Sequence, residues 1–435
     1  MVIVKLDNKL SLINMADLSI PLGIPSLELI TQTIDKEGNI ILTVQSMKAE
    51  CTCYKCGKTA TKRYGYAPII RIRHLSILDT PSYIEIQPVR YKCDNCGKVT
   101  TESYDWCNQR SNTTEALDKY LSRMLINSTC TDVAKKEQLS YKTLLQAIDR
   151  QVGKKVDWRQ YKDLKVIGID EISNKKGHQE YYTIISVVCA NNKVSVIAVL
   201  ADRKKETVKA FLESIPLELK KTVKTVCTDM YDGFVQSAIE VFGEKAVVID
   251  RYHVSKLYRK PLDKLRIQEM QRLKKELSQE KYAELEGLMW ILRKNHECLN
   301  EADKRKLKKL YIYSPKLKQA HNFALKLTHV FNTHGSRKSS IAKINRWIYK
   351  VERSDLTCFN SFIVTLEKYK AGIANYFKNR KNSGFVEGLN NKIKVAKRRC
   401  YGFFKVESLF QRLFLDLCGY DAFTGLLTNS YPCHK

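Results

Sequence analysis

Hydrophobic residues follow three patterns along the chain, and each predicts a different kind of structure. Near the N-terminus, short apolar runs such as Leu27–Ile30 and Ile40–Val44 are separated by turn residues, which predicts β-strands. From Thr113 to Val152 apolar residues recur at spacings of three and four, which predicts helices. Beyond Asp163 strand-like and helix-like segments alternate. We therefore expect a multidomain α/β protein.

The α/β part opens with LKVIGID, an apolar run at Leu164–Asp170 that ends on an acid. Val166, Ile167 and Ile169 predict a strand buried on both faces. The runs YYTIISVVCA and KVSVIAVL predict two more strands of a meander, and two further strands follow, each after a predicted helix. A three-stranded meander followed by helix, strand, helix and strand is the order of an RNase H-like fold.

The two later strands also run into acids: Val223–Cys227 is followed by Asp229, and the next strand by Asp250. A carboxylate at the end of a buried strand lies where the sheet meets a cleft, and there it can hold a metal ion. The alternative is an ordinary aspartate in a turn. Glu171 is a poorer candidate than Asp170, because alternation along a strand turns it to the opposite side.

Two helical regions follow. Between about residues 254 and 365 the pattern is helical and heavily charged, which indicates an insertion whose basic faces either lie along DNA or are ordinary solvated faces. The closing segment SGFVEGLNNKIKVAKRRCYGF predicts a helix with a buried stripe of Val386, Leu389, Ile393 and Ala396. Another face of this helix carries Glu387, Asn391, Lys394 and Arg398. The helix is either simply amphipathic and basic, or it brings a carboxylate, an amide and basic groups to a metal-bound phosphodiester.

Charge narrows the class of partner. The chain of 435 residues has 75 Lys and Arg against 46 Asp and Glu, a net charge of +29. Such an excess predicts a polyanionic partner, most simply nucleic acid, with an anionic membrane surface as the competitor. No apolar run approaches the roughly 18 residues of a membrane span, and the start lacks a signal peptide's basic region and apolar core. We expect a cytoplasmic protein with no membrane partner.

Two Cys-x-x-Cys pairs stand out among the 14 cysteines. In CTCYKCGK and RYKCDNCGK each pair is followed directly by a glycine, which relieves the backbone strain of a tight turn. Two such turns offer four thiolates for a structural Zn²⁺ in a small β-rich domain: Cys53, Cys56, Cys93 and Cys96. Cys51 and His74 are spare ligands, and the alternative is a set of unrelated reduced cysteines.

The helical pattern after the cysteine pairs predicts a helix, a short second helix, a tight turn and a third helix capped by Ser140. This is the arrangement of a helix-turn-helix, whose last helix can enter the major groove of DNA. Tyr141, Lys142 and Gln146 would then point at the DNA. A plain three-helix bundle is the alternative.

Three acids form the candidate catalytic site. Asp170 and Asp229 end strands that would be neighbours in the predicted sheet, and Glu387 would come from a helix packed against it. Phosphodiester chemistry requires positioned divalent cations, and a few convergent carboxylates suffice to hold Mg²⁺.

The chain also resembles a known family. The segments GIDEISNKKGHQEYYTII, CTDMYDGF, VIDRYHVSKLYRKPLDKLR and VEGLNNKIKVAKRRCYGF are similar to those of insertion-sequence transposases of the ISL-three type, over nearly the whole chain. The resemblance implies that Asp170, Asp229 and Glu387 hold Mg²⁺ or Mn²⁺, and that the zinc domain and helix-turn-helix recognise terminal inverted repeats. It matches Asp250, Arg251 and His253 to a family motif. In that motif Asp250 is an accessory acid, and Arg251 and His253 contact DNA phosphate. The alternative for His253 is a structural role, in which it caps or packs a helix.

These predictions give an organisation and a function. Residues 1–45 form an N-terminal segment, 46–110 the zinc-binding domain, 111–155 the helix-turn-helix, and 160–425 an RNase H-like catalytic domain with a helical insertion at about 254–365. The predicted function is a DNA transposase that cleaves and transfers strands, working on double-stranded DNA as at least a dimer. The alternatives are a non-catalytic DNA-binding regulator and a structure-selective nuclease on the same fold.

Overall fold

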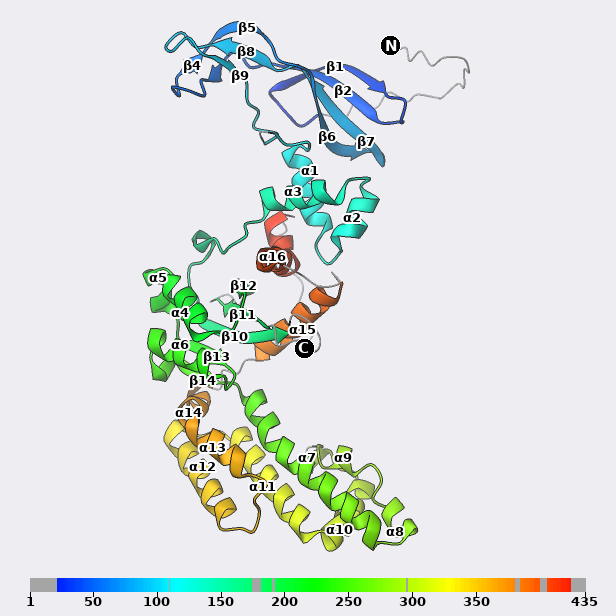
Figure 1. Ribbon diagram of the computed structural model, residues 1–435, viewed down its shortest axis with the longest axis vertical. Helices are drawn as coiled ribbons and strands as arrows, with labels where there is room; N and C mark the ends of the chain where they lie inside the picture. The colour runs from blue at the N-terminus through cyan, green and yellow to red at the C-terminus, as the bar shows by residue number, and fades with distance from the viewer. Residues whose placement is uncertain are drawn as a thin grey trace. The chain divides into compact units, whose positions relative to one another are not determined.

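The computed structural model describes residues 22–108, 110–173, 181–189, 192–294, 296–379, 384–399 and 405–423 (Figure 1). The chain divides into two compact units. Unit 1 comprises Met1–Lys154, Arg398–Tyr401 and Gln411–Lys435, and unit 2 comprises Lys155–Lys397 and Gly402–Phe410. Strands and helices occur in both units, which confirms a multidomain α/β protein.

A four-stranded sheet opens unit 1. Its strands are β1 (Leu27–Ile34), β2 (Ile40–Ser46), β6 (Ile70–Ile77) and β7 (Thr80–Ile86), in the order β1-β2-β7-β6. The two predicted strands are present and pair as an antiparallel hairpin, and the Asp35 carboxylate accepts the backbone N–H groups of Glu37 and Asn39 in its turn. Because β2 pairs with β7, this sheet joins strands from both sides of the boundary predicted at residue 45.

The cysteine pairs lie in a second set of short strands. A two-stranded sheet contains β3 (Cys51–Thr52) and β4 (Thr59–Ala60). A three-stranded sheet contains β5 (Lys62–Tyr66), β8 (Val89–Lys92) and β9 (Val99–Thr101), in the order β5-β8-β9. The apolar cluster here contains little besides Ala60, Val89, Tyr91 and the cysteines themselves, so packing alone offers few contacts to hold it.

Three helices follow where the sequence predicts them: α1 (Glu115–Met124), α2 (Cys130–Lys136) and α3 (Tyr141–Gln151). We call them the helical module. The hydroxyls of Thr114, Thr129 and Ser140 cap them, each accepting the backbone N–H three residues on. Their apolar stripes meet in one core that contains Leu117, Leu121 and Leu144.

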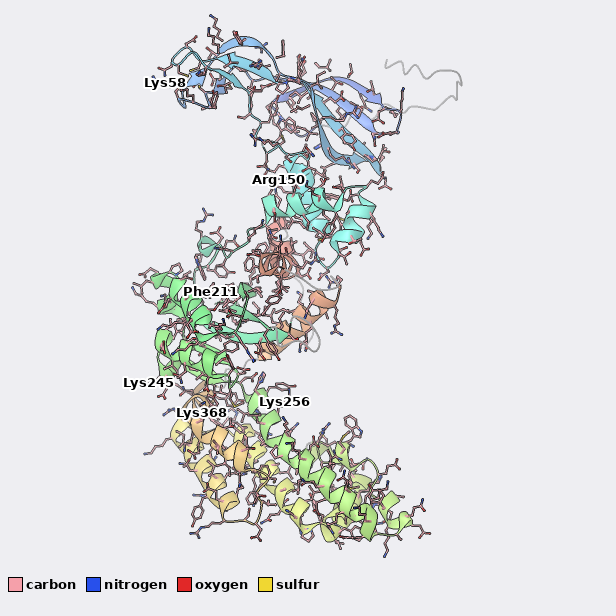
Figure 2. The ribbon with its side chains drawn as sticks, viewed as in Figure 1. Lys58, Arg150, Phe211, Lys245, Lys256 and Lys368 are labelled. Atoms are coloured by element: carbon pink, nitrogen blue, oxygen red, sulfur yellow. The ribbon has the colours of Figure 1, made fainter. Side chains whose placement is uncertain are left out.

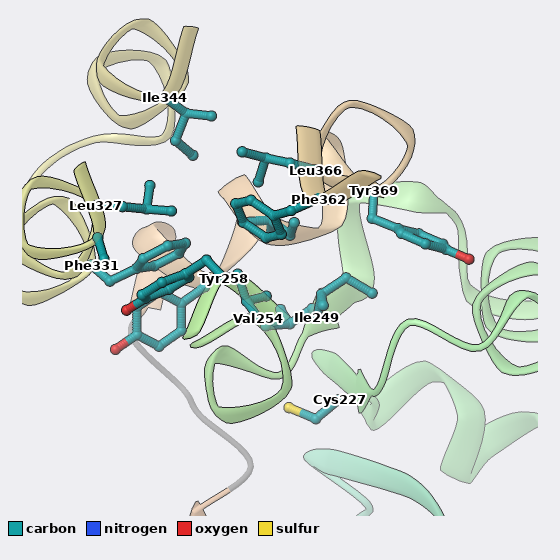
Figure 3. Packing of buried hydrophobic residues seen from close by; sticks show 14 of the residues in the cluster. Cys227, Ile249, Val254, Tyr258, Leu327, Phe331, Ile344, Phe362, Leu366 and Tyr369 are labelled. Atoms are coloured by element: carbon teal, nitrogen blue, oxygen red, sulfur yellow. The ribbon is translucent and has the colours of Figure 1, made fainter. Parts of the chain in front are cut away.

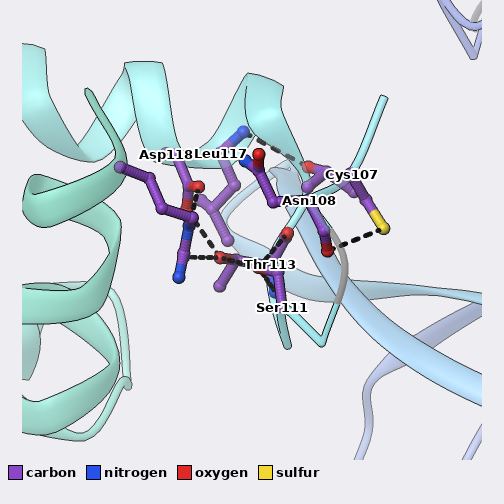
Figure 4. Close-up of polar contacts among 8 residues, drawn as sticks. Cys107, Asn108, Ser111, Thr113, Leu117 and Asp118 are labelled. Atoms are coloured by element: carbon purple, nitrogen blue, oxygen red, sulfur yellow. Dashed lines mark hydrogen bonds and ion pairs between the residues drawn. The ribbon is translucent and has the colours of Figure 1, made fainter. Parts of the chain in front are cut away.

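A buried ion pair joins the first helix of the module to the third (Figure 4). Asp118 is completely buried, and its carboxylate oxygens accept from Arg150 Nε at 2.6 Å and Nη2 at 2.9 Å. The Thr113 hydroxyl donates to the same carboxylate at 2.6 Å and accepts from Arg150 Nη2 at 2.6 Å. Arg150 therefore neutralises the buried charge of Asp118, and Thr113 donates a further hydrogen bond to the same carboxylate.

The helical module is completed from the far end of the chain. The C-terminal half of α16 (Val406–Phe423) belongs to unit 1 and places Leu415 in the module's core. Gln411 Nε2 donates to Asp149 Oδ1 and to the Val152 carbonyl, at 3.0 and 2.9 Å. The predicted catalytic range 160–425 therefore ends differently from unit 2, because the residues from Gln411 onward pack on the module.

Unit 2 is built on a five-stranded sheet in the order β12-β11-β10-β13-β14. The strands are β10 (Val166–Ser173), β11 (Tyr181–Val188), β12 (Val194–Leu200), β13 (Thr225–Thr228) and β14 (Val247–Ile249). The first three form an antiparallel meander, and β13 and β14 run parallel to β10. The helices α4 (Lys205–Ser214), α5 (Leu217–Thr222) and α6 (Asp232–Phe242) connect the strands, and α5 was not predicted.

One prediction about the first strand was wrong. The strand β10 does not stop at Asp170 but continues to Ser173. The reason is its antiparallel neighbour, since β11 pairs with β10 from Val166 through Ser173, whereas the parallel partner β13 ends at Thr228, opposite Ile169. At Asp170, β10 thus still pairs with β11 on one side, while β13 has already ended on the other side.

The helical insertion begins directly after β14. Its helices are α7 (Arg251–Glu276), α8 (Gln279–Ala283), α9 (Leu288–Ile291), α10 (Glu301–Tyr313), α11 (Pro315–Asn332), α12 (Arg337–Glu352), α13 (Asn360–Lys368) and α14 (Lys370–Asn379). Short 3-10 turns occur at Trp158–Gln160, Glu244–Ala246 and His296–Cys298, and α15 (Gly384–Arg399) follows α14. Within the described residues, no helix combines the length and hydropathy needed to cross a membrane.

The insertion shares one apolar core with the sheet (Figure 3). Tyr258 of α7 meets Phe362 of α13 with ring centroids 5.8 Å apart, and its hydroxyl lies 2.8 Å from that of Thr328. On α14, Gly372 allows a close approach to β14, because a Cβ there would lie 2.8 Å from Ile249 Cγ1. The insertion is therefore packed firmly on the sheet that carries the acids.

Candidate functional site

Three acids follow one another at adjacent parallel strands of unit 2. Ile169 pairs with Thr228, and Thr228 pairs with Ile249. The next residues along the three strands are Asp170, Asp229 and Asp250. Because the strands are parallel and in register, the three residues lie in a row at one edge of the sheet. This is the neighbourhood that the sequence predicted for Asp170 and Asp229.

Asp229 lies in an environment that opposes its charge. Burial raises the pKa of the Asp229 carboxyl to about 6, and the charges of Asp170 and Glu171 add to the effect. The Tyr231 backbone N–H, 3.0 Å from Asp229 Oδ1, and the nearby His253 act in the opposite direction but do not cancel it. Two carboxylates that repel each other in a partly buried place are suited to a shared divalent cation.

Glu171 is held away from that role by a salt bridge. Its Oε2 accepts from Arg203 Nη1 at 2.9 Å. The Arg203 guanidinium lies over two aromatic rings, 4.4 Å from the centroid of Tyr181 and 4.8 Å from that of Tyr231. Arg203 therefore contacts both Glu171, which is next to Asp170, and Tyr231, which lies two residues after Asp229.

The third predicted acid lies on α15. The structure describes Glu387 as part of this helix, but its side chain lies outside the described residues. The predicted stripe is observed at Leu389, Ile393 and Ala396, which are buried, while Val386 lies outside the described side chains. Lys397, near the end of α15, donates to the Ser173 carbonyl at the end of β10.

The residues after β14 begin α7. Asp250 is 8% exposed and caps this helix, since its Oδ1 accepts the Tyr252 N–H at 2.9 Å. His253 Nε2 lies 3.8 Å from Asp250 Oδ2. Arg251 donates to the Tyr376 hydroxyl at 3.3 Å and to Asn332 Oδ1. Arg251 thus links α7 to α14 and α11, a structural role that its sequence motif did not indicate.

A second acid–base group flanks the site and was missed by sequence reasoning. Asp232, at the start of α6, accepts from Lys368 Nζ and from the Tyr369 hydroxyl. Those two hydrogen bonds lower the pKa of the Asp232 carboxyl. The partners lie more than a hundred residues apart, so no local pattern could have found them; Lys368 is labelled in Figure 2.

The four predicted zinc ligands form a cluster in unit 1. The sulfurs of Cys53, Cys56, Cys93 and Cys96 all lie within 4.8 Å of one another. The pairs Cys53–Cys96 and Cys56–Cys93 are 3.5 and 3.6 Å apart. Four sulfurs at about 2.3 Å from one zinc ion would be about 3.8 Å apart, so the cluster fits a tetrahedral site.

The backbone of the two turns supports the thiolates. Gly57 and Gly97 have φ angles of +70° and +68°, which a residue with a Cβ adopts only with strain. The Cys56 and Lys55 N–H groups lower the pKa of Cys53 to about 6. The Lys98 N–H favours the Cys96 thiolate, but burial and the other three sulfurs outweigh it and raise the pKa of Cys96 to about 11. A cation that neutralises the cluster resolves this conflict.

The two spare ligands are not part of the cluster. Burial and the charge of Glu102 raise the pKa of the Cys51 thiol, with smaller contributions from Cys53 and Cys93. His74 lies in the four-stranded sheet, where its Nδ1 is 3.0 Å from the Thr114 hydroxyl.

The predicted DNA-facing residues are exposed. On α3 these are Tyr141, Lys142 and Gln146, with Tyr141 54% exposed, while Leu144 and Ala147 face the core. On α15, Asn391, Lys394 and Arg398 are also exposed. Exposure leaves these positions available to a partner but does not by itself select one.

Comparison with known proteins gives the same family throughout. A family model for transposases of the ISL-three DDE type matches residues 167–413. The transposase for insertion sequence element IS1001 of Bordetella parapertussis is 25% identical over 366 residues, which cover 83% of this chain and 87% of the relative. The transposase for insertion sequence element IS1557 of Mycobacterium tuberculosis is 22% identical over 390 residues, covering 85% and 86%.

Proposed function

Because the chain belongs to the ISL-three family of insertion-sequence transposases, we propose that it cleaves and joins DNA at a site formed by Asp170, Asp229 and Glu387. The observation that carries this proposal is the register of the parallel strands, which puts Asp170 and Asp229 side by side. The pKa of Asp229, raised to about 6 by burial and by Asp170, supports it further, since carboxyls with strongly shifted pKa values often belong to functional sites.

A contact between α15 and β10 supports Glu387 as the third acid. Lys397 contacts the Ser173 carbonyl, and Glu387 lies ten residues earlier, about 15 Å along a helix. Asp170 precedes Ser173 by three residues, about 10 Å along a strand. A helix that runs back along β10 from this contact brings Glu387 near the level of Asp170.

Divalent cations fit the donor set of the site, because carboxylates are the hard oxygen ligands that Mg²⁺ and Mn²⁺ prefer. When bound, such cations lower the barrier to phosphodiester attack by stabilising charge on the attacking and leaving oxygens. The carboxylates of Asp170, Asp229 and Glu387 would hold and orient them. Water attacks the phosphorus at the element's end and the bond to the 3′ oxygen breaks. The freed 3′ hydroxyl then attacks a phosphorus of the target DNA, whose bond to its own 3′ oxygen breaks.

We propose the RNase H-like fold for the sheet of unit 2. The succession along the chain, a meander of three strands followed by β13 and β14, is the one expected from the sequence, and the strands lie in the order β12-β11-β10-β13-β14. The proposed catalytic domain spans residues 160–425 with the insertion at about 254–365, except that the residues of α16 from Gln411 onward belong to unit 1.

The N-terminal modules are proposed to recognise the terminal inverted repeats of the element. Residues 46–110 hold a structural Zn²⁺ at the cysteine cluster, and residues 111–155 form a helix-turn-helix. The exposed Tyr141, Lys142 and Gln146 on α3 are placed to read DNA in the major groove. Asn391, Lys394 and Arg398 on α15, with Arg251 and His253, are proposed to contact the DNA backbone.

A strand-transfer assay with Mg²⁺ and candidate terminal DNA tests the site. We expect Asp170→Ala, Asp229→Ala and Glu387→Ala each to abolish cleavage while DNA binding persists. Glu218→Ala is the matched control, because that carboxylate is on α5 and its side chain is 82% exposed. Full activity in any of the three variants removes that residue from the site.

The same assay separates the alternatives. Binding by the wild-type protein without cleavage of any terminal DNA would point to a regulator. Cleavage without joining would point to a nuclease. Joined products that require the protein's own copies to pair two ends would support a homo-oligomer on DNA.

A further inference from the structure

A pocket of about 430 Å³ opens between α11 and α12 of the helical insertion. Its apolar lining includes Phe323 and Trp347, which are 8% and 4% exposed, with ring centroids 6.2 Å apart at an interplanar angle of 85°. The Trp347 indole N–H donates to the Phe323 carbonyl at 2.8 Å. The polar group of the indole is thus already satisfied, and the pocket is left with an apolar, fixed wall.

Basic side chains surround this apolar wall. Lys326 and His329 come from α11, and Lys343, Arg346 and Lys350 come from α12. The spacing of three and four puts the α12 residues on one face of the helix. All five are exposed, and Lys343, Arg346 and Lys350 form no ion pair with another residue in the described part of the chain. They are positioned to attract an anion rather than to stabilise the fold.

The surrounding sequence strengthens the positive potential. Between Asp303 and Glu352 the chain has 13 Lys and Arg and no acid at all, so Glu352 at the end of α12 is the one acid on α11 and α12. Exposed cations usually alternate with acids on a solvated helical face. Their absence over α11 and nearly all of α12 indicates a surface selected for a polyanion.

The combination of a basic rim and an apolar pocket indicates which class of ligand would bind. Cations alone suit any phosphate, but an apolar pocket beside them suits a flat apolar group joined to a phosphate, which is a nucleotide. In duplex DNA the bases are stacked on one another, so a whole base cannot enter a pocket unless it leaves the stack. Proteins that bind unpaired strands combine a basic track with apolar or aromatic contacts to the bases.

We propose that α11 and α12 bind unpaired DNA, with the phosphates along Lys343, Arg346 and Lys350 and a base in the pocket. The proposal rests on the proposed function in taking DNA as the polyanion, and it assigns the helical insertion a role that the acid site does not need. It would hold a single strand that is separated from its complement while the element's ends are processed.

The test uses the full-length, zinc-loaded protein in an Asp170→Ala background without added Mg²⁺, so that no DNA is cut. Fluorescence anisotropy measures binding of a short oligothymidine, an abasic oligonucleotide of the same length, and a duplex. Val330→Trp fills the pocket without changing charge, and Leu325→Trp fills it from another position on α11. Lys343→Ala with Arg346→Ala removes two rim charges. Arg305→Ala with Lys308→Ala removes the same charges from α10, outside the pocket.

We expect the unaltered pocket to favour oligothymidine over the abasic strand by about tenfold, the effect of about one base contact. Val330→Trp and Leu325→Trp should abolish that preference and leave abasic affinity unchanged. The Lys343→Ala, Arg346→Ala protein should bind both strands more weakly. The slope of log K against log salt should fall by about 1.4, about 0.7 for each lost contact with a single strand. The α10 control should keep the slope.

Equal binding of oligothymidine and the abasic strand, or a preference that survives both tryptophan variants, would overturn the base pocket. A salt slope equal to that of the α10 control would overturn the phosphate track. A duplex bound better than oligothymidine, with the same loss in the rim variant, would also overturn the proposal. Cleavage by the protein with Asp170 intact is scored separately. If no cleavage is seen but the oligothymidine preference is, only the proposed function is refuted. If cleavage is seen but the oligothymidine preference is not, only the single-strand site on α11 and α12 is refuted.

Discussion

Replacing Asp229 with asparagine should make the Mg²⁺-free protein more stable at neutral pH while destroying its activity. The substitution removes the charge but keeps an oxygen that can accept the Tyr231 N–H, which lies 3.0 Å from Asp229 Oδ1. Burial and the neighbouring Asp170 disfavour the carboxylate in the folded state, raising its pKa from 3.8 to about 6. The wild-type protein therefore bears an electrostatic cost that the variant lacks.

The magnitude follows from linkage. A carboxyl with a pKa of about 6 folded and 3.8 unfolded destabilises the fold by about 3 kcal/mol when fully ionised. Solvent reaches part of the side chain, so screening reduces this to about 1–3 kcal/mol. The folded state binds the proton more tightly, so the cost is fully present above about pH 6. It is lost as the pH falls, and disappears below about pH 4.

Urea unfolding from pH 4 to 8 measures the effect, followed by tryptophan fluorescence, since Trp158, Trp290 and Trp347 lie in unit 2. Asp232→Asn is the control with the opposite sign. Hydrogen bonds from Lys368 and Tyr369 lower the pKa of Asp232, so its replacement should slightly destabilise the protein above about pH 4. Added Mg²⁺ should stabilise the wild type by mass action and should stabilise Asp229→Asn less.

Two results would refute this reasoning. One is an Asp229→Asn protein no more stable than the wild type at pH 7.5 without Mg²⁺. The other is a stability difference that stays constant between pH 4 and pH 8, which would show that packing rather than charge separates the two proteins.

Three further perturbations should act on the fold. Arg150→Met leaves the fully buried Asp118 carboxylate without its cation and should destabilise the helical module by about 3–5 kcal/mol. The measurement is amide hydrogen exchange, which should become faster in α1 and α3. Unchanged exchange would count against this prediction. Removing zinc with a chelator should expose the amides of β3, β4, β8 and β9 to exchange while α11 stays protected, because four thiols that fit one ion hold this small core; a folded metal-free protein would disprove the assignment. Gly372→Val should destabilise unit 2 by about 1–3 kcal/mol in urea unfolding, because its Cβ would lie 2.8 Å from Ile249 Cγ1. Gly388→Ala, with no atom of the described residues within 4 Å of its Cβ, should not destabilise the protein, because Ala is favoured over Gly inside a helix by about 0.5–1 kcal/mol.

Local signals explain what the sequence predicted well. Ser140 precedes a helical stripe and caps α3 as expected, because a cap depends only on residues three positions away. The two cysteine turns could be predicted equally well, because the tight turn of each Cys-x-x-Cys-Gly segment depends only on residues within that segment. The acids Asp170 and Asp229 could be placed because each comes directly after a run of buried strand residues, and parallel pairing brings the two runs together.

Contacts between distant segments explain what the sequence did not predict. The end of α16 completes the helical module through Gln411 and Leu415, and nothing in the local pattern of α16 indicates which core it joins. The extension of β10 past Asp170 depends on β11 and not on the composition of β10. Arg203 lies in a charged stretch, DRKKE, and only its partner Glu171 distinguishes it from its neighbours.

The arrangement of charges around the acids explains why a cation from solution would be needed there. Arg203 pairs with Glu171, and Lys368 pairs with Asp232, so two nearby basic side chains are bound to other carboxylates. If either cation neutralised Asp229, its pKa would be lowered, yet it is raised. Burial and the neighbouring acids thus outweigh every nearby cation at Asp229, whose pKa stays raised in a chain with a net charge of +29. A divalent cation is the kind of ligand that would stabilise such a carboxylate.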